Sequence, residues 1–278
     1  MSRVSPVTPP VDSVELEAKV RAMYRAVAED PRGSYHFELG RDLAERLGYP
    51  TDELDRIPAG AVESFAGVGY FFDLAGLRVG EEVLDLGSGS GMDVFFAACQ
   101  VGPHGRIVGV DVTPEQLAKA EGLRLEGRFD QVTFIEGHIE DLAFPDASFD
   151  VVISNGVINL SVDKRRVFAE AARVLRPGGR LAIADIIAEV ELTPQIVANT
   201  DLWASCIGGA AQQDAYQEAI EAAGLRLELM KKNRYQFISD RARNASESYG
   251  VRSVSALARK QATSESGLTG IGGYGQET

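Results

Sequence analysis

One stretch of the sequence, residues 82–92, constrains the fold more than any other. It reads Glu-Val-Leu-Asp-Leu-Gly-Ser-Gly-Ser-Gly-Met, so a short aliphatic run passes into three glycines at alternate positions, followed by an apolar segment. Glycine permits positive φ angles and lets the backbone come close to a ligand. Free N–H groups at the start of a helix bind the polar end of such a ligand. The stretch therefore predicts a strand, a ligand-binding turn and a helix, as in nucleotide-binding α/β domains.

Strand and helix patterns alternate after this point. Strands are expected at 82–86, 107–110, 132–135, 151–154 and 181–185, separated by helices at 93–99, 114–123 and 164–175. Such alternation is typical of a parallel sheet covered on both faces. After a helix near 215–223, strands at 225–230 and 254–259 lack room for a crossover and predict antiparallel pairing. We therefore expect an α/β, Rossmann-like, doubly wound and mostly parallel seven-stranded sheet with an antiparallel last strand.

The rest of the chain predicts a helical cap and two tails. Val14, Val20, Met23 and Val27 recur at helical spacing, a second helix is expected at 36–47, and no strand pattern occurs before residue 78. The expected division is a disordered tail at 1–12, a helical cap or lid at 13–78, the α/β domain at 79–261 and a disordered tail at 262–278. The cap helix could pack on its own domain or on a second copy in a homo-oligomer, and both arrangements stay open.

Composition excludes several classes of protein. The net charge of −13 argues against a nucleic-acid partner, since such proteins present Lys- and Arg-rich surfaces. Two cysteines in 278 residues form no disulfide framework. Neither a leader-like apolar region nor a run of about 18 apolar residues occurs. We therefore expect a cytoplasmic protein without a membrane span.

Acidic residues at two strand ends specify the ligand. Asp85 ends the first strand, where its carboxylate suits an ammonium group, and Asp111 ends the second, where it suits two ribose hydroxyls. Nicotinamide dinucleotides are bound by G-x-G-x-x-G, but here the third glycine, Gly91, comes one residue early. The combination favours S-adenosylmethionine as the cofactor.

The segment from about 60 to 210 resembles the arsenite methyltransferases and, more loosely, the ubiquinone/menaquinone C-methyltransferases. The stretches that carry the resemblance are 64–67, 83–89, 110–114, 153–161 and 175–181. The resemblance implies a class I methyltransferase that releases S-adenosylhomocysteine. It also implies a set of cofactor-binding residues: Asp85, Gly87, Ser88, Gly89, Gly91, Asp111, Val112, His138, Ile139 and Asn155.

The sequence departs from that family at the acceptor site. The family holds As(III) through three cysteines, because a soft metalloid needs soft ligands. Two of these positions are Val68 and Gly156 here, and only Cys206 remains. No metal site is therefore expected. The apolar replacements favour a small hydrophobic organic acceptor in a pocket formed by Tyr24, Val68, Tyr70, Phe71, Gly156, Trp203 and Cys206.

The chemistry expected is methyl transfer to carbon in specialised metabolism, on a terpenoid or prenylated indole. Candidate catalytic residues are Tyr24 as a lid residue, His138 as a base or a cofactor contact, and Asn155 at the end of the fourth strand. Two alternatives stay open: an arsenite methyltransferase with a reduced thiol site, and a protein that binds the cofactor without catalysis.

Overall fold

The structure is a computed structural model that describes residues 11–204 and 206–262. The tails expected at 1–12 and 262–278 lie outside this part, apart from residues 11, 12 and 262. Among the described residues, no helix is both long and apolar enough to cross a membrane.

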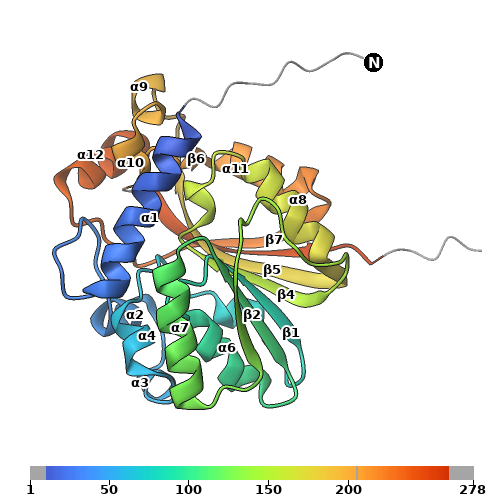
Figure 1. The fold of residues 1–278 in the computed structure, drawn as a ribbon. Helices are drawn as coiled ribbons and strands as arrows, with labels where there is room; N and C mark the ends of the chain where they lie inside the picture. The colour runs from blue at the N-terminus through green and yellow to red at the C-terminus, as the bar shows by residue number, and fades with distance from the viewer. Residues whose placement is uncertain (1–10, 205, 263–278) are drawn as a thin grey trace, which may run out of the picture.

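A twisted sheet runs through the described chain (Figure 1). Its strand order is β3-β2-β1-β4-β5-β8-β7, and the short β6 pairs with the end of β5. Strands β1 to β5 are parallel, whereas β8 is antiparallel to both β5 and β7. The strands are β1 (Glu82–Leu86), β2 (Arg106–Asp111), β3 (Val132–Glu136), β4 (Phe149–Asn155), β5 (Leu175–Ala188), β6 (Ala211–Gln212), β7 (Leu225–Lys232) and β8 (Arg252–Lys260). The predicted fold class is confirmed, and the two-residue β6 is an addition too short to leave a sequence pattern.

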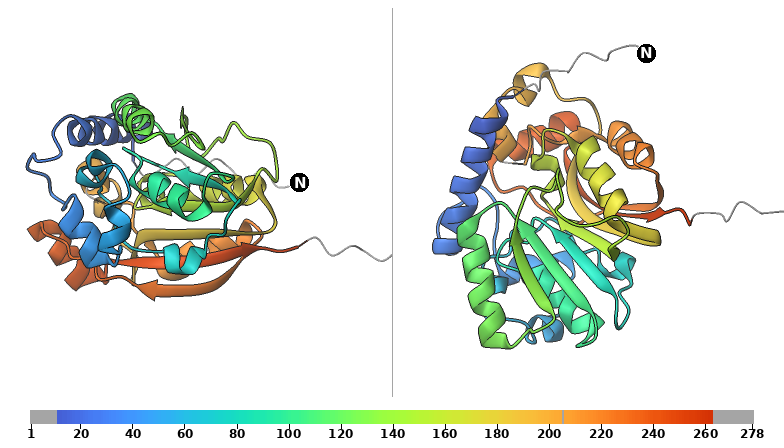
Figure 2. Two further views of the ribbon diagram at one scale, coloured as in Figure 1. Left: turned by 90° about the horizontal axis from the view of Figure 1, so that it is seen from below. Right: turned by 45° about the vertical axis from the view of Figure 1, so that its right-hand side comes forward.

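Helices cover both faces of the sheet (Figure 2), because successive strand residues point to opposite sides. Val83 packs on one face with α6, and Leu84 packs on the other with α8 and α11. The larger helices after β1 are α6 (Met92–Val101), α7 (Pro114–Gly127), α8 (Lys164–Val174), α11 (Gln213–Ala222) and α12 (Asp240–Tyr249). Shorter ones are η1 (Ile158–Leu160), α9 (Pro194–Val197) and α10 (Thr200–Ala204). The sequence did not predict α12, because only two alanines, Ala242 and Ala245, form its buried side.

The segment before β1 belongs to the same hydrophobic core. Its short helices are α2 (Arg41–Leu47), α3 (Thr51–Leu54), α4 (Ala59–Glu63) and α5 (Phe72–Ala75). Leu43 and Phe72 share one buried cluster with Val83 of β1 and Phe96 of α6. The domain boundary at 78/79 thus stays a prediction, since the core is continuous across it. The helix expected at 36–47 was wrong for 36–40, because Gly40 takes φ 86° and helix α2 starts only after it.

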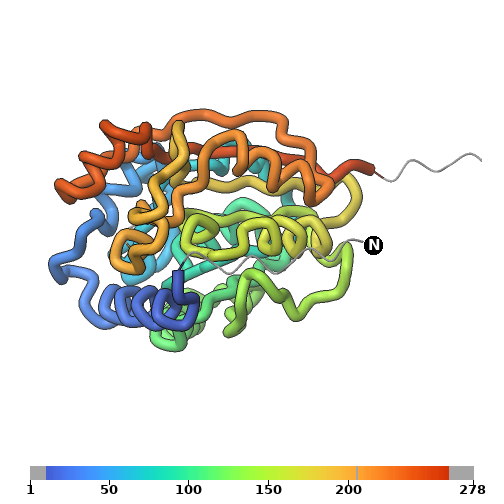
Figure 3. The backbone as a smooth tube through the Cα atoms, turned by 90° about the horizontal axis from the view of Figure 1, so that it is seen from above, coloured from blue at the N-terminus to red at the C-terminus, as the bar shows by residue number. Residues whose placement is uncertain are grey.

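Helix α1 (Ser13–Glu29) packs on its own chain, beside α7 and α10 (Figures 1 and 3). The Asp12 carboxylate caps it by accepting hydrogen bonds from the N–H groups of Val14 and Glu15. Leu16 packs against Trp203 of α10 in a small apolar cluster. The N-terminal helix predicted by the spacing of its apolar residues is therefore confirmed, and its packing partners lie in the same molecule.

Candidate functional site

The glycine turn after β1 has the backbone that its sequence predicts. Gly87, Gly89 and Gly91 take φ values of 77°, 51° and 90°, a region that side chains disfavour. A Cβ on Gly91 would lie 2.7 Å from Phe134 Cζ, whereas a Cβ on Gly89 would meet only Gln116 Oε1, at 3.8 Å. Gly91 is thus closed in by the core, and Gly89 faces open space.

That space is a cavity of about 480 Å³. It lies at the carboxyl ends of β1, β2 and β4, where the order of the strands reverses, the usual ligand position in open α/β sheets. Of the predicted cofactor-binding residues, all but Gly91 line it: Asp85, Gly87, Ser88, Gly89, Asp111, Val112, His138, Ile139 and Asn155. Other walls come from α1 and from the loop before β1, through Leu16, Val20, Tyr24, Ser64, Phe65 and Gly67.

Three buried carboxyl groups border the cavity. Burial raises the pKa of Asp85 well above its usual range, and the nearby charges of Asp93 and Asp111 raise it further. No hydrogen bond from the described residues reaches the Asp85 carboxylate. The Asp111 carboxylate accepts hydrogen bonds from Gly89 N at 2.9 Å and Thr113 N at 2.8 Å, and burial raises its pKa.

Asn155 joins three parts of the site. Its Oδ1 accepts hydrogen bonds from Val68 N at 2.8 Å and Gly69 N at 3.3 Å, and its Nδ2 donates to Asp93 Oδ2 at 2.9 Å. Tyr49 donates to Asp93 Oδ1 at 2.6 Å. Burial raises the pKa of Asp93 to about 6, although the hydrogen bonds from Tyr49 and Asn155 oppose the shift. Because Asn155 Nδ2 also donates to the carbonyl of Gly69 at 3.0 Å, both polar atoms of Asn155 hold the 65–69 loop.

Helix α1 is held over the cavity by two side chains of α7. Gln116 Nε2 donates to the carbonyl of Tyr24 at 2.7 Å. Lys119 Nζ donates to the carbonyl of Ala28 at 3.2 Å and to Ser64 Oγ at 2.7 Å. These contacts place the ring of Tyr24 on the cavity wall. A lid position for Tyr24 agrees with this geometry, and its role in catalysis stays a prediction.

Two further polar side chains, Cys206 and Tyr235, lie within electrostatic range of the Tyr24 hydroxyl. Burial raises the pKa of Tyr24, and the charges of Cys206, Tyr235 and Asp111 raise it further. Neither the Tyr24 nor the Tyr235 hydroxyl has a hydrogen-bond partner among the described residues. Burial raises the pKa of the Cys206 thiol to about 12, although a hydrogen bond with Asn159 opposes the shift. At neutral pH this group therefore consists of two phenols and one thiol, all protonated.

His36 lies near the same region. Burial lowers the pKa of the His36 imidazole, although a hydrogen bond with the backbone of Ala204 opposes the shift. The ring is therefore neutral at pH 7. Its Nε2 is buried without a partner among the described residues. Phe37 packs edge-on against this ring, with centroids 4.7 Å apart, and stacks on Tyr24 at 6.1 Å.

The other residues expected in the substrate pocket do not line the cavity. Phe71 is fully buried and stacks on Phe72, and Tyr70 packs against Tyr49 with ring centroids 4.9 Å apart. Trp203 lies under α1 and donates from Nε1 to the carbonyl of Val197 at 2.6 Å. These three aromatic side chains belong to the packing of the core and the lid.

Val68 and Gly156 lie against each other. A Cβ at Gly156 would be 3.2 Å from Val68 Cγ1, and Gly156 takes φ 74°. The two positions that carry cysteines in the resembling family are thus neighbours here, and neither supplies sulfur. Cys206 also does not line the cavity.

Some site residues carried little sequence signal. Tyr49 follows a glycine and precedes a proline in an apparent loop, and Asp93 lies within an apolar helix. Gln116 and Lys119 share one face of α7, and only the packing of α1 reveals what that face contacts. A charged residue inside an otherwise apolar helix, such as Asp93, was the one available clue, since buried charges require partners.

The cavity fits S-adenosylmethionine. The unpartnered Asp85 carboxylate suits the ammonium group, and the open face of Gly89 leaves room for backbone contact. Asp111 retains lone pairs for ribose hydroxyls, beside Val112 and the 138–141 loop, which would border the adenine.

Comparisons with known proteins agree with this geometry. A family profile described as "Methyltransferase domain" matches residues 77–224. The arsenite methyltransferase of Halobacterium salinarum is 40% identical over 199 residues, which are 71% of this chain and 51% of that protein. The ubiquinone/menaquinone biosynthesis C-methyltransferase of Hahella chejuensis is 37% identical over 118 residues, 42% of this chain and 47% of its own. The chain thus spans about half the length of the curated relatives it matches.

A solved structure extends the likeness. The arsenic(III) S-adenosylmethionine methyltransferase from Chlamydomonas reinhardtii superposes with a TM-score of 0.61 at 32% identity, covering 81% of this chain and 75% of that one. Sequence, fold and cavity agree, and the chain belongs to the methyltransferase-domain family, among the relatives of the arsenite methyltransferases, with S-adenosylmethionine as its cofactor.

Proposed function

We propose that this chain is an S-adenosylmethionine-dependent methyltransferase that acts on a small organic acceptor bound beside Tyr24. The observation that carries the first part is the unpartnered Asp85 carboxylate beside the glycine turn, in a cavity at the strand-order reversal. Membership of the methyltransferase-domain family supports the same conclusion.

Methyl transfer requires few catalytic groups from the protein. Bound S-adenosylmethionine supplies an electrophilic methyl group, and its thioether leaving group needs no acid. The protein holds the acceptor in line with that methyl and excludes water. Asp85 and Asp111 would hold the two polar ends of the cofactor, while Asn155 and Asp93 fix the 65–69 loop beside them.

The absence of a thiolate set supports an organic acceptor. Val68 and Gly156 supply no sulfur, and the Cys206 thiol stays protonated at neutral pH. Tyr24 lines the cavity and its hydroxyl has no partner among the described residues, so the acceptor would be largely apolar with at least one hydrogen-bond-accepting atom.

We propose an electron-rich carbon as the methylated atom. The aromatic rings of Tyr24 and Phe37 would stabilise positive charge developing on such a substrate. The proton that the product then loses would go to the neutral His36, whose Nε2 has no partner among the described residues but whose ring lies against Phe37 and does not line the cavity.

Arsenite is the second candidate, and the relatives favour it. The Halobacterium salinarum and Chlamydomonas reinhardtii proteins are both named for arsenic methylation. A trivalent arsenical already bound to small thiols would need fewer protein ligands, and Cys206 would be the one residue able to exchange onto it.

A single assay separates these functions. The purified protein is incubated with S-adenosylmethionine and either arsenite plus glutathione or a panel of isoprenoid, indole and phenolic compounds, and products are identified by mass spectrometry. A methylated organic product that Cys206→Ser retains, and that Asp85→Asn forms more slowly at limiting S-adenosylmethionine, would support the main proposal. Methylated arsenic that Cys206→Ser abolishes would replace it with the second candidate. Binding of S-adenosylhomocysteine without any product would indicate a non-catalytic protein.

A further inference from the structure

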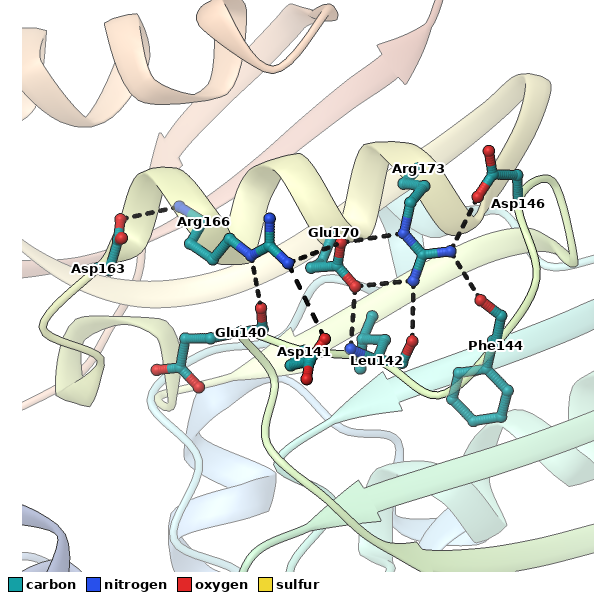
Figure 4. A network of polar contacts seen from close by, with 9 residues as sticks. All are labelled: Glu140, Asp141, Leu142, Phe144, Asp146, Asp163, Arg166, Glu170 and Arg173. Carbon is teal, nitrogen blue, oxygen red and sulfur yellow. Dashed lines mark hydrogen bonds and ion pairs between the residues drawn. The ribbon is translucent and has the colours of Figure 1, made fainter. Parts of the chain in front are cut away.

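The chain between β3 and β4 contains no helix or strand, yet it forms one wall of the cavity. His138, Ile139, Glu140 and Asp141 line that wall. A stretch without its own hydrogen-bonded ladder needs outside partners to hold one conformation. Helix α8, none of whose residues line the cavity, supplies them (Figure 4).

Two arginines of α8 bind three alternate carbonyls of the loop, those of residues 140, 142 and 144. Arg166 Nε donates to Glu140 O at 2.9 Å. Arg173 donates from Nη2 to Leu142 O at 2.8 Å and from Nη1 to Phe144 O at 2.7 Å. Residues seven apart lie on the same face of a helix, so Arg166 and Arg173 can both reach the loop that runs along α8.

Glu170 lies on α8 between the two arginines and binds both the loop backbone and Arg173. Its Oε2 accepts hydrogen bonds from Leu142 N at 2.9 Å and from Arg173 Nη2 at 2.7 Å, and its Oε1 accepts one from Arg173 Nε at 2.9 Å. The Glu170 side chain is only 5% exposed. The hydrogen bond from Arg173 is the largest of the effects that lower the pKa of Glu170, so this carboxylate is charged at neutral pH.

Neither Glu170 nor Arg173 reaches the cavity itself. We propose that the Glu170–Arg173 pair positions the adenosine end of the cofactor, by fixing the 138–144 loop against which that end binds. This inference rests on the proposed binding of S-adenosylmethionine. Both residues act through the loop backbone, so they are positioning residues and take no part in the chemistry.

The physical consequence is a selective loss of affinity. A loop freed from α8 samples several conformations, and only the fraction that is competent binds the cofactor. The affinity then falls by that fraction. The methyl group lies at the other end of the cofactor, so the rate at saturating cofactor stays the same.

The test compares Arg173→Lys with Arg243→Lys by titration calorimetry. Lysine keeps the charge of Arg173 but lacks the fork that binds two carbonyls and Glu170 together. Arg243, on α12, pairs with Asp240 three residues earlier and is the matched control. For Arg173→Lys we expect about tenfold weaker binding of S-adenosylhomocysteine, an equal loss for adenosine alone, and an unchanged kcat. Arg243→Lys should bind both ligands as the unaltered protein does.

Three outcomes would overturn the inference. The first is a lower Tm for Arg173→Lys with unchanged affinities at a temperature where it is folded, which would mean a purely structural role. The second is a loss for S-adenosylhomocysteine without an equal loss for adenosine. The third, no binding of S-adenosylhomocysteine by the unaltered protein, would remove the proposed function as well. If Arg173→Lys does not fold, Arg166→Lys tests the same loop, since it removes only the contact to Glu140 O and the weaker ion pairs.

Discussion

At the scale of single residues, the site depends on side chains whose burial would be unfavourable without a ligand. Asp85 is 2% exposed and has no hydrogen-bond partner among the described residues. Burying a carboxylate without a partner is unfavourable, which is why its pKa rises. A bound cation would stabilise the charged form of Asp85, so this residue favours a cofactor with a positively charged group.

We expect Asp85→Asn to weaken binding of S-adenosylhomocysteine about 10- to 100-fold, since a hydrogen bond to a charged group contributes about 1.5–3 kcal/mol. Titration calorimetry measures the effect. The matched control is Asp52→Asn, an exposed position in the first turn of α3, which should leave the affinity unchanged. Equal affinities for the two variants would show that Asp85 does not contact the ligand.

Gly91 gives a second prediction, because its backbone and its neighbours both exclude a side chain. Its φ is 90°, and a Cβ there would lie 2.7 Å from Phe134 Cζ. We therefore expect Gly91→Ala to lower the free energy of unfolding by about 1–3 kcal/mol. Gly122 lies inside α7 with no atom within 4 Å of such a Cβ, so Gly122→Ala should raise stability by about 0.5–1 kcal/mol. Urea denaturation of both variants checks the difference in sign.

At the scale of elements, α1 packs on two helices, α7 and α10, rather than on the sheet. It is held by α7 and α10 through side chains such as Gln116, Lys119 and Trp203. An element attached by a few such contacts opens more easily than one built into a sheet. This arrangement suits a lid that must admit and release the cofactor.

Gln116→Ala removes the hydrogen bond to Tyr24 O and also the one that Gln116 Oε1 accepts from Ser90 Oγ. We therefore expect it to speed hydrogen exchange in α1, and loss of the bond to α1, about 0.5–1.5 kcal/mol, to raise the dissociation rate of S-adenosylhomocysteine about 2- to 12-fold. Exchange mass spectrometry and stopped-flow measurements follow the two effects. Gln217→Ala, on the exposed side of α11, removes a comparable contact to Glu221 and serves as the control. Unchanged exchange in α1 would contradict a lid held by Gln116.

At the scale of the whole molecule, buried carboxyl groups gather at one edge of the sheet. Asp85, Asp93, Asp111 and Asp185 all have raised pKa values, and burial is the largest cause in each. Between the ordinary pKa of Asp and the raised values, the folded protein binds more protons than the unfolded chain. The free energy of unfolding should therefore fall as the pH rises through this window.

For the cofactor-free protein we expect a Tm that decreases from about pH 5 to pH 7, because the Asp93 pKa of about 6 lies inside that range. Saturating S-adenosylhomocysteine should reduce the decrease by stabilising the charged form of Asp85, and Asp85→Asn should show a shallower decrease without ligand. Differential scanning fluorimetry across this range is sufficient. A Tm that rises with pH would mean that the salt-bridged carboxylates outside the site dominate.

The sequence predicted most elements of the sheet because their patterns are local. The strands after residue 82 carry β-branched runs, and the closing pair β7 and β8 follows from the short distance between them. The helix expected at 36–47 was wrong only for 36–40, because Gly40, a single residue with positive φ, separates that stretch from α2. The short helices α9 and α10 and strand β6 are too brief to show any periodicity.

What the sequence determined by itself is the cofactor half of the site. The glycine turn, Asp85 and Asp111 lie within 27 residues, and the backbone between them follows from local rules on glycine and strand ends. Only the tertiary structure decided the acceptor half. In the structure, Cys206 and Tyr235 lie within electrostatic range of Tyr24. Phe71 and Trp203 pack in the core and under α1. Asn155 donates a hydrogen bond to Asp93. The physical reason is that these contacts span up to about 200 residues, and their geometry depends on how whole elements pack, which no local pattern encodes.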